Sequence, residues 1–355
     1  RMKVAIITDT HFGARSDSIP FDNFFESFYN DAFFPEIEKQ GVKTIIHLGD
    51  IFDRRKYINF NTLASCKRYF FDEARRRGID IHLIPGNHDT YFKNTNEVNS
   101  PNLLLAEYDN IILYQDPTEV KFGNTNILLM PWICSENYAA SKDALENADA
   151  AICFGHFELA GFQMYKGVRN EHGMDPKIFN QFDLVCSGHF HHRDRSGNIF
   201  YLGNPYEITW SDYDDPRGFH IMETETVDFT FYENPYRMFH KVYYDDSDVQ
   251  AMKQIAEFDY STLQNRSVKL IVVNKTDFTA FDKLVDTLYT CNLNELKIIE
   301  DFSEFEDEAV GEENIDLEDT MTLLVDYVDN INTDLDRDRL KTQLRTLYVE
   351  AQDIQ

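Results

Sequence analysis

The sequence predicts an α/β protein in which buried strands alternate with helices, and three observations support this class. Five apolar segments of strand length, ending at residues 8, 49, 86, 155 and 188, carry bulky side chains on both faces, as strands covered on both sides do. Segments with helical spacing of apolar residues lie between them. Each apolar segment also runs into a side chain that can bind a metal ion. We therefore expect the carboxyl ends of the strands to carry the chemistry.

Seven candidate metal ligands follow these segments. They are Asp9, His11, Asp50, Asn87, His156, His189 and His191. After four of the segments a Gly precedes the ligand, and Gly lets the backbone turn sharply and approach a bound group. If the strands share a sheet, their carboxyl ends form one edge, so these residues should converge. His47 and His82 lie inside strands, and we interpret them as structural.

The types of ligand indicate a transition-metal site. Carboxylate, amide and imidazole groups without thiolates fit Mn²⁺, Fe²⁺ or Zn²⁺. Seven ligands are too many for one such ion. One carboxylate bridging two ions about 3.5–4 Å apart would use them all, and such a pair can clamp a phosphate during displacement.

Length, charge and cysteine content limit the classes of function. A chain of 355 residues can bury a large core and is expected to form more than one domain. The formal net charge of −28 argues against a broad basic face, so any contact with nucleic acid must be local or aided by cations or a partner. The same charge could serve solubility alone. Five scattered cysteines predict reduced thiols in a cytosolic protein, and no apolar run is long enough to span a membrane.

We expect four successive regions. Residues 1–236 carry the ligand motifs, and Asn234-Pro235 marks a break before a small α+β region at 237–299. Residues 300–316 form an acidic linker that contains no Lys or Arg. Residues 317–355 contain two helical patterns, the second with Thr333 and Asp336 as its N-terminal cap. These helices suit a groove or coiled coil of a partner, unless they fold back on their own domain.

The order and spacing of the ligand motifs resemble those of the calcineurin-like metallophosphoesterases. The motifs are Asp9-Thr10-His11, Gly49-Asp50-Ile51-Phe52-Asp53, Gly86-Asn87-His88-Asp89, Gly155-His156 and Gly188-His189-Phe190-His191. Within that superfamily the chain is most similar to the DNA-break-repair nucleases typified by SbcD and to the recombination endonuclease subunits of T-even-type phages. The resemblance implies a four-layer α/β/β/α sandwich of two mixed sheets. It also implies that residues 237–299 form a capping domain and residues 317–355 an ATPase-binding helix pair.

The resemblance further implies two Mn²⁺ ions, with Mg²⁺ or another divalent metal as possible replacements. One ion would take Asp9, His11 and His191, the other would take Asn87, His156 and His189, and Asp50 would bridge them. A water activated by both metals would attack the phosphodiester.

Five residues beside the ligands also receive expected roles. His88 would face the phosphate and stabilise the transition state or protonate the leaving oxygen. Asp89 would orient His88 or its loop, or serve only in the turn. Asp53 stands where the family usually has a second His near the phosphate, so its part in catalysis differs from the family pattern. Arg54 or Arg55 could hold the phosphate instead, or belong to a solvated basic loop.

The implied activity is Mn-dependent cleavage of DNA, as an exonuclease on duplex ends and an endonuclease on single strands, in double-strand-break repair and recombination. The implied partners are an SMC-like coiled-coil ATPase, bound by the C-terminal helices, and a second copy of the chain. The helical aromatic face from Phe21 to Phe28 packs in the core or forms that dimer contact near Phe24 and Phe28. The implied location is the cytoplasm of a phage-infected bacterial cell.

Two other functions stay open at this point. A phosphomonoesterase or protein phosphatase could use the same dimetal scaffold, and the segment from Gly49 to Arg54 looks like phosphatase loops. A stand-alone phosphatase, however, needs no tethered helix pair. The metals could also stabilise a scaffold that brings an ATPase to DNA, with or without catalysis.

Overall fold

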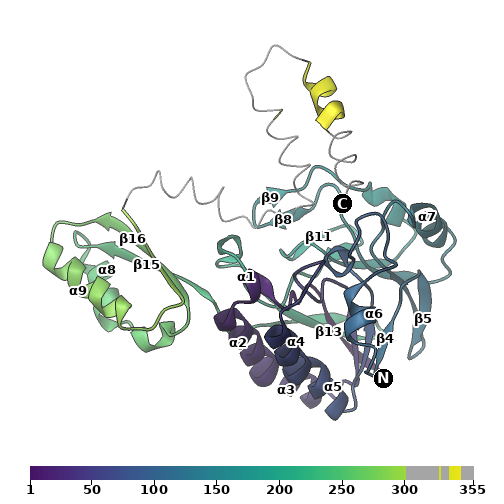
Figure 1. The fold of residues 1–355 in the computed structure, drawn as a ribbon, viewed down its shortest axis with the longest axis horizontal. Coiled ribbons are helices and arrows are strands. Elements are labelled where there is room, and N and C mark those ends of the chain that lie inside the picture. Colours follow the sequence, from purple (N-terminus) through teal and green to yellow (C-terminus); the bar gives the residue numbers. More distant parts are fainter. Residues whose placement is uncertain (301–327, 329–335, 345–355) are drawn as a thin grey trace.

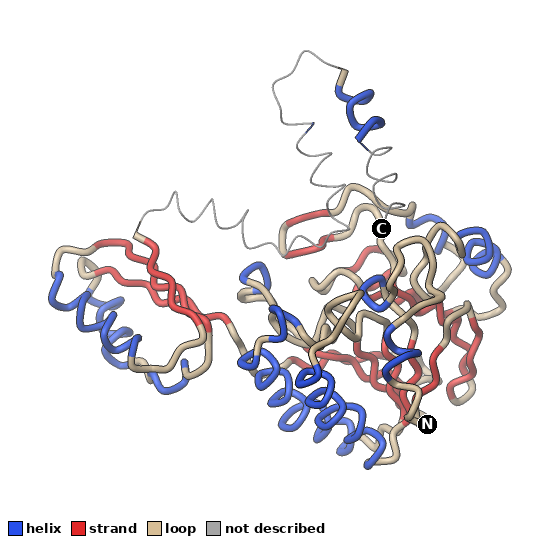
Figure 2. Tube along the Cα trace, in the orientation of Figure 1, coloured by secondary structure: helices blue, strands red, loops and turns tan. Residues whose placement is uncertain are grey.

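The computed structural model describes residues 1–300, 328 and 336–344. Within these residues the chain forms two six-stranded sheets, a three-stranded sheet and a two-stranded hairpin. Figure 1 shows the two large sheets and their helices in one body, with the three-stranded sheet and its two helices to one side. Figure 2 shows the same separation by secondary structure. No helix in the described ranges is both long and apolar enough to cross a membrane.

The first large sheet has the strand order β14-β13-β1-β2-β3-β4. Its strands are β1 (Lys3–Ile7), β2 (Thr44–His47), β3 (Asp80–Leu83), β4 (Ile111–Leu113), β13 (Gly218–Glu223) and β14 (Phe229–Glu233). Strands β1 to β4 are parallel, whereas β13 and β14 run antiparallel to their neighbours β1 and β13. The sheet is therefore mixed.

Six helices accompany this sheet in the chain. They are α1 (Ala14–Asp17), α2 (Ile19–Phe28), α3 (Phe34–Lys39), α4 (Phe60–Cys66), α5 (Asp72–Arg76) and α6 (Ser100–Leu104). A π-helical turn at Tyr29–Phe33 joins α2 to α3, and a second at Lys67–Phe71 joins α4 to α5. Two long, continuous helices result, and they lie beside each other along one side of the body (Figure 1).

The second large sheet has the strand order β11-β12-β10-β7-β6-β5 and is also mixed. Its strands are β5 (Thr118–Phe122), β6 (Thr125–Met130), β7 (Ile152–His156), β10 (Leu184–Gly188), β11 (Asp194–Ser196) and β12 (Ile199–Tyr201). Helix α7 (Tyr138–Glu146) follows β6, and the hairpin of β8 (Gln163–Tyr165) and β9 (Val168–Arg169) follows β7.

Three apolar clusters define the four layers. Along β1, Ala5 and Ile7 belong to the cluster that contains the helical aromatic residues, whereas Val4 and Ile6 belong to the cluster between the sheets. This alternation is the period of two that a strand imposes. A third cluster covers the outer face of the second sheet and includes Leu145 of α7. The four-layer α/β/β/α sandwich of two mixed sheets is thus confirmed.

The structure decides two points that the sequence left open. The five ligand-bearing strands do not share one sheet, because β1, β2 and β3 belong to the first sheet while β7 and β10 belong to the second. The helical aromatic face is not a dimer surface, because Phe24 and Phe28 are 1% and 0% exposed. Phe28 packs against the rings of Tyr206 and Phe219, so this face fills the core, where aromatic rings bury a large area.

The three-stranded sheet is formed by β15 (Phe239–Asp245), β16 (Ser267–Asn274) and β17 (Glu295–Ile299), all parallel. Helices α8 (Val249–Glu257) and α9 (Phe278–Tyr289) connect these strands. The unit has an apolar cluster of its own, which includes Tyr244, Leu270 and Leu284. The domain boundaries at residues 236 and 299 stay a prediction.

Only a small part of the C-terminal region falls within the described residues. Residues 337–344 are helical, and the Asp336 carboxylate accepts hydrogen bonds from the amides of Asp338 (3.0 Å) and Arg339 (3.3 Å). Asp336 therefore caps this helix, and Thr333, the other residue of the predicted cap, lies outside the described residues. The acidic linker beyond Glu300 and nearly all of the first predicted helix lie outside the described residues.

Candidate metal centre

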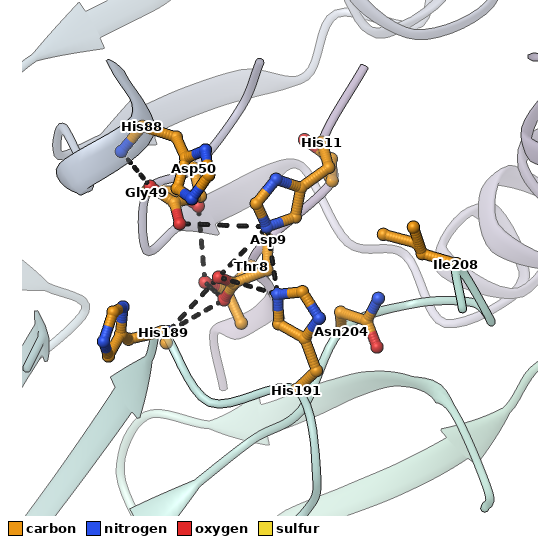
Figure 3. A network of polar contacts seen from close by, with 12 residues as sticks. Thr8, Asp9, His11, Gly49, Asp50, His88, His189, His191, Asn204 and Ile208 are labelled. Atoms are coloured by element: carbon orange, nitrogen blue, oxygen red, sulfur yellow. Dashed lines mark hydrogen bonds and ion pairs between the residues drawn. The ribbon is translucent and has the colours of Figure 1, made fainter. Parts of the chain in front are cut away.

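All seven predicted ligands lie in one cluster at the carboxyl ends of strands from both large sheets. Ligand atoms of Asp9, His11 and His191 lie within 4.8 Å of one another, and so do those of Asp50, His156 and His189. The Nε2 atoms of His11 and His191 face each other at 3.0 Å, and each lies 3.7 Å from Oδ1 of Asp9. Figure 3 shows the rings of His11 and His191 turned toward the Asp9 carboxylate, which also accepts from the backbone amide of His189.

Asp50 lies between the two groups. Its Oδ2 is 3.8 Å from Nε2 of His11 and 3.3 Å from Nε2 of His156. Asn87 completes the second group, because its Oδ1 is 2.9 Å from Nε2 of His156 and 3.1 Å from Nδ1 of His189. The arrangement matches two neighbouring sites that share one carboxylate, although the ligand roles themselves stay a prediction.

The backbone at the site is held in a conformation that side chains rarely adopt. Asp9, His11, Asp50 and His189 have φ values of 55°, 42°, 55° and 95°. Residues in this region carry strain that the surrounding structure must offset, and such residues cluster at functional sites. The Gly before His189 is also required, since a Cβ at Gly188 would lie 2.1 Å from Oγ1 of Thr8. The strand ends are thus shaped to bring the ligands together.

Electrostatics ties the carboxylates to the imidazoles. Burial raises the pKa of Asp9, but the nearby charge of His156 and a hydrogen bond from His11 outweigh it and bring the pKa to about 2. Burial lowers the pKa of His156, but the carboxylates of Asp50 and Asp9 raise it to about 9. Burial, with the adjacent His11, lowers the pKa of His191 to about 4. The buried carboxylates therefore depend on positive charge beside them.

The residues fit a pair of divalent cations. Asp9 and Asp50 are 0% and 1% exposed, and two buried carboxylates a few ångströms apart are costly without cations between them. Imidazole and carboxylate donors without Sγ suit Mn²⁺, Fe²⁺ or Zn²⁺. Asp9, His11 and His191 would hold one ion, Asn87, His156 and His189 the other, and Asp50 both.

Asp89 and His88 shape the loop that follows Asn87. The Asp89 carboxylate accepts from the amides of Asp50 (2.7 Å), Ile51 (2.9 Å) and Gly86 (2.9 Å). Asp89 therefore clamps the loop that carries Asp50 to the loop that carries Asn87. The amide of His88 donates to Oδ1 of Asp50 at 2.8 Å, so this loop also fixes the shared carboxylate.

The structure places the other two residues predicted for catalysis differently from each other. Asp53 lies in the cluster, with Oδ1 3.3 Å from Nδ1 of His11, and its carbonyl oxygen is 2.6 Å from Nδ1 of His88. The guanidinium of Arg54 donates instead to Asp17 at 2.7 Å and stacks on Tyr57. Those contacts favour a role in holding its loop over a role in holding phosphate.

His47 and His82 have structural contacts. Nε2 of His47 is 3.0 Å from Oγ1 of Thr10 and its Nδ1 accepts from the amide of Gly49, while burial lowers its pKa to about 3. Nδ1 of His82 is 2.7 Å from the hydroxyl of Tyr114. Both rings therefore link their strand to a neighbouring segment, which agrees with the structural role that the sequence suggested.

A model of the calcineurin-like phosphoesterase family matches residues 2–193, over which the strands and donors described above are distributed. The chain belongs to this family. Exonuclease subunit 1 of Enterobacteria phage T4 is 33% identical over 362 residues, covering 99% of each chain.

Two more distant relatives are similar over part of the chain. The SbcD component of nuclease SbcCD from Staphylococcus saprophyticus is 22% identical, covering 64% of this chain and 67% of its own. DNA double-strand break repair protein Mre11 of Sulfurisphaera tokodaii is 28% identical, covering 54% of this chain and 50% of its own. The resemblance seen in the motifs is thus confirmed, and membership of the family implies a divalent-metal site.

Sequence reasoning missed two residues that support this phosphoesterase centre. The ring of Trp132 lies 5.4 Å from that of His189 and 5.9 Å from that of His156, forming an aromatic wall beside the second group. Arg217 is 1% exposed, and its guanidinium donates to the carbonyl oxygen of His191. Arg217 stands in a turn far from the motifs, where only its burial reveals its importance.

The buried Arg217 should matter for stability. It pairs with Asp212 at 3.0 Å and with Asp215 at 2.9 Å, so Arg217→Met would leave two buried carboxylates without their cation. We expect the free energy of unfolding to fall by about 3–5 kcal/mol, measured by urea denaturation. Arg195→Met is the matched control, because Arg195 is exposed over the Phe200 ring and should cost at most about 1 kcal/mol. Equal losses in the two variants would contradict the assignment.

Proposed function

We propose that this chain is a metal-dependent DNA nuclease that hydrolyses phosphodiesters with two Mn²⁺ ions, on duplex ends and on single strands. The observation that carries the proposal is the convergence of seven oxygen and imidazole donors at one point, with Asp50 between two groups. The likeness to a phage exonuclease subunit over nearly the whole chain supports DNA as the substrate. So do the relatives named as a nuclease component and a break-repair protein.

The residues around the proposed metal sites have separate roles. Bound divalent ions would supply positive charge at the phosphate and an activated water. Asp50 spaces the two groups, and its position is fixed by the His88 amide, while the Asp89 clamp joins the loops that carry Asp50 and Asn87. His88 acts on the phosphate or the leaving oxygen. Its Nδ1–H donates to the carbonyl of Asp53, and this bond fixes the ring so that Nε2 can face the substrate.

The metal requirement and the role of His88 can be tested together. Chelation of divalent metal should abolish cleavage of labelled DNA, and Mn²⁺ should restore it. His88→Asn should still bind two Mn²⁺ ions yet cleave about 10²–10⁴-fold more slowly, because it lacks the group that transfers a proton. His82→Asn is the control. His82 contacts Tyr114 away from the metal centre, so this variant should cleave DNA at the wild-type rate. Normal turnover by His88→Asn would remove His88 from the mechanism, and faster hydrolysis of a phosphomonoester than of DNA would favour the phosphatase alternative.

We further propose an SMC-like coiled-coil ATPase as a partner of the C-terminal region, in the cytoplasm of a phage-infected cell. Within the described helix at 337–344, Leu340 and Leu344 lie one turn apart and are half-buried. With a net charge of −28, this chain should attract the DNA phosphates only weakly, and an ATPase partner would add the missing contacts with DNA.

Deletion of residues 317–355 tests that partner. The shortened chain should retain Mn²⁺-dependent cleavage of DNA, because the donors all precede residue 192, but should lose binding of the ATPase in a pull-down assay. Retained ATPase binding would show that another surface recruits the partner.

We also propose that the chain forms a homodimer through a surface other than the buried aromatic helix. Tyr57, Val98 and Leu103 are 67%, 38% and 69% exposed and line one cavity of about 150 Å³. Phe60, at the start of α4, is 89% exposed. Exposed large apolar residues that line a common hollow, here beside the basic Arg54, Arg55 and Lys56, are typical of a protein–protein contact.

Light scattering can test the dimer. Leu103→Glu should convert a dimer to a monomer, because a carboxylate would be buried in an apolar contact. Phe278→Glu changes an apolar side chain that is 64% exposed on α9 and should leave the mass unchanged. A Leu103→Glu protein with the wild-type dimer mass would place the contact elsewhere.

A further inference from the structure

We propose that two carboxylates outside the ligand sets, Asp53 and Glu158, hold the imidazoles of His11 and His189 from behind, one for each metal site. They are positioning residues that fix which ring nitrogen carries the proton and which faces the metal. The inference rests on the proposed dimetal function and assigns the residues that tune it. It also gives a reason for Asp53 at a position where the family usually has His.

The contact of Asp53 with His11 supports the first assignment. His11 is 3% exposed, and its Nε2 faces Asp9, Asp50 and His191. Its Nδ1, on the opposite side of the ring, lies 3.3 Å from Oδ1 of Asp53. This is an ion-pair distance, and Nδ1 forms no hydrogen bond within the described residues. Because an ionised carboxylate can only accept a hydrogen bond, a proton on Nδ1 would satisfy Asp53 and leave the lone pair on Nε2. A carboxylate placed behind an imidazole in this way also makes the ring a stronger metal donor.

Glu158 stands in the corresponding place behind His189. Nδ1 of His189 is 3.1 Å from Oδ1 of Asn87, whereas its Nε2 is 3.9 Å from Oε2 of Glu158. That separation is within ion-pair range, and a bridging water or a small rotation would complete a hydrogen bond. The Glu158 backbone is fixed, since its carbonyl accepts from the amide of Met174 at 2.9 Å. Glu158 follows β7, which carries His156, so one segment contributes both a donor and a support.

A third imidazole shows the same design with a neutral acceptor. Nδ1 of His156 is 2.7 Å from the carbonyl oxygen of Leu48, while its Nε2 faces Asn87 and Asp50. Three of the four candidate imidazoles thus have an oxygen acceptor behind the nitrogen that faces away from the centre. The buried His156 uses a carbonyl, whereas His11 and His189 use carboxylates that are about three-tenths exposed. Solvent near these two carboxylates lowers the cost of their charge.

The backbone of Asp53 makes a second contact, separate from that of its side chain. Its backbone carbonyl accepts from Nδ1 of His88 at 2.6 Å. Substitution of the side chain removes the support of His11 but keeps this carbonyl. Variants of Asp53 therefore separate the effect on the metal ligand from the effect on His88.

The test is titration of the metal-free, full-length chain with Mn²⁺, with free Mn²⁺ followed by electron paramagnetic resonance. Wild-type protein should bind two ions. Asp53→Ala and Glu158→Gln should each weaken one of the two sites about 10–100-fold and leave the other unchanged, and the double variant should weaken both. Asp53→Glu should recover part of the lost affinity. Glu171→Gln, at an exposed carboxylate in the loop after β9, is the matched control and should bind as wild type does.

A second measurement keeps the proposal falsifiable if a variant is unstable. Long-range proton–nitrogen spectra of the Mg²⁺-bound protein should show His11 protonated at Nδ1, and Asp53→Ala should change that pattern. The proposal is overturned if both variants bind two Mn²⁺ ions with wild-type affinities. It is also overturned if Asp53→Ala cleaves poorly with unchanged metal binding, because Asp53 would then act on the substrate. A wild-type chain that binds two ions but does not cut DNA would refute the nuclease and leave these assignments standing.

Discussion

The structure depends on the burial of two carboxylates, Asp9 and Asp50, where the two large sheets meet. Neither side chain reaches solvent, and each is surrounded by donors that come from a different part of the chain. Burying negative charge costs free energy that only positive charge or hydrogen bonds can offset. The left-handed backbone at both residues adds to that cost. The cost of buried charge and the cost of backbone strain therefore fall at the same site, the proposed metal centre.

Other buried residues hold the loops that carry these carboxylates and their neighbouring imidazoles. The amides of Asp50 and Gly86 donate to Asp89, which joins the end of β2 to the end of β3. Arg217 links the loop after β10 to the turn before β13. These buried contacts fix the loops beyond the ends of the strands. The aromatic core under α2 serves a different purpose, since it makes the first sheet a rigid base for the donors.

The sequence was sufficient for the parts of the fold that depend on local pattern. The apolar run Val4-Ala5-Ile6-Ile7 predicts a strand with two buried faces. The metal-binding side chains that follow such runs predict the metal centre. Pattern alone did not show that β7 and β10 belong to a second sheet, because a buried strand has the same composition in either sheet. The sequence also did not identify Arg217, since no local pattern distinguishes a buried Arg from an exposed one. The pairing of Arg54 with Asp17 escapes the sequence for a related reason, as nothing local reveals it.

The distribution of donors along the chain has a consequence for how the protein matures. The first donor is residue 9 and the last is residue 191, and they belong to both sheets. No early segment of a growing polypeptide can therefore assemble the complete cradle. Because each proposed metal site takes donors from both sheets, binding of the ions would require the second sheet to be docked on the first, and bound ions would then link the two halves. A nascent chain stalled before β10 would lack His189 and His191, so it could complete neither proposed site.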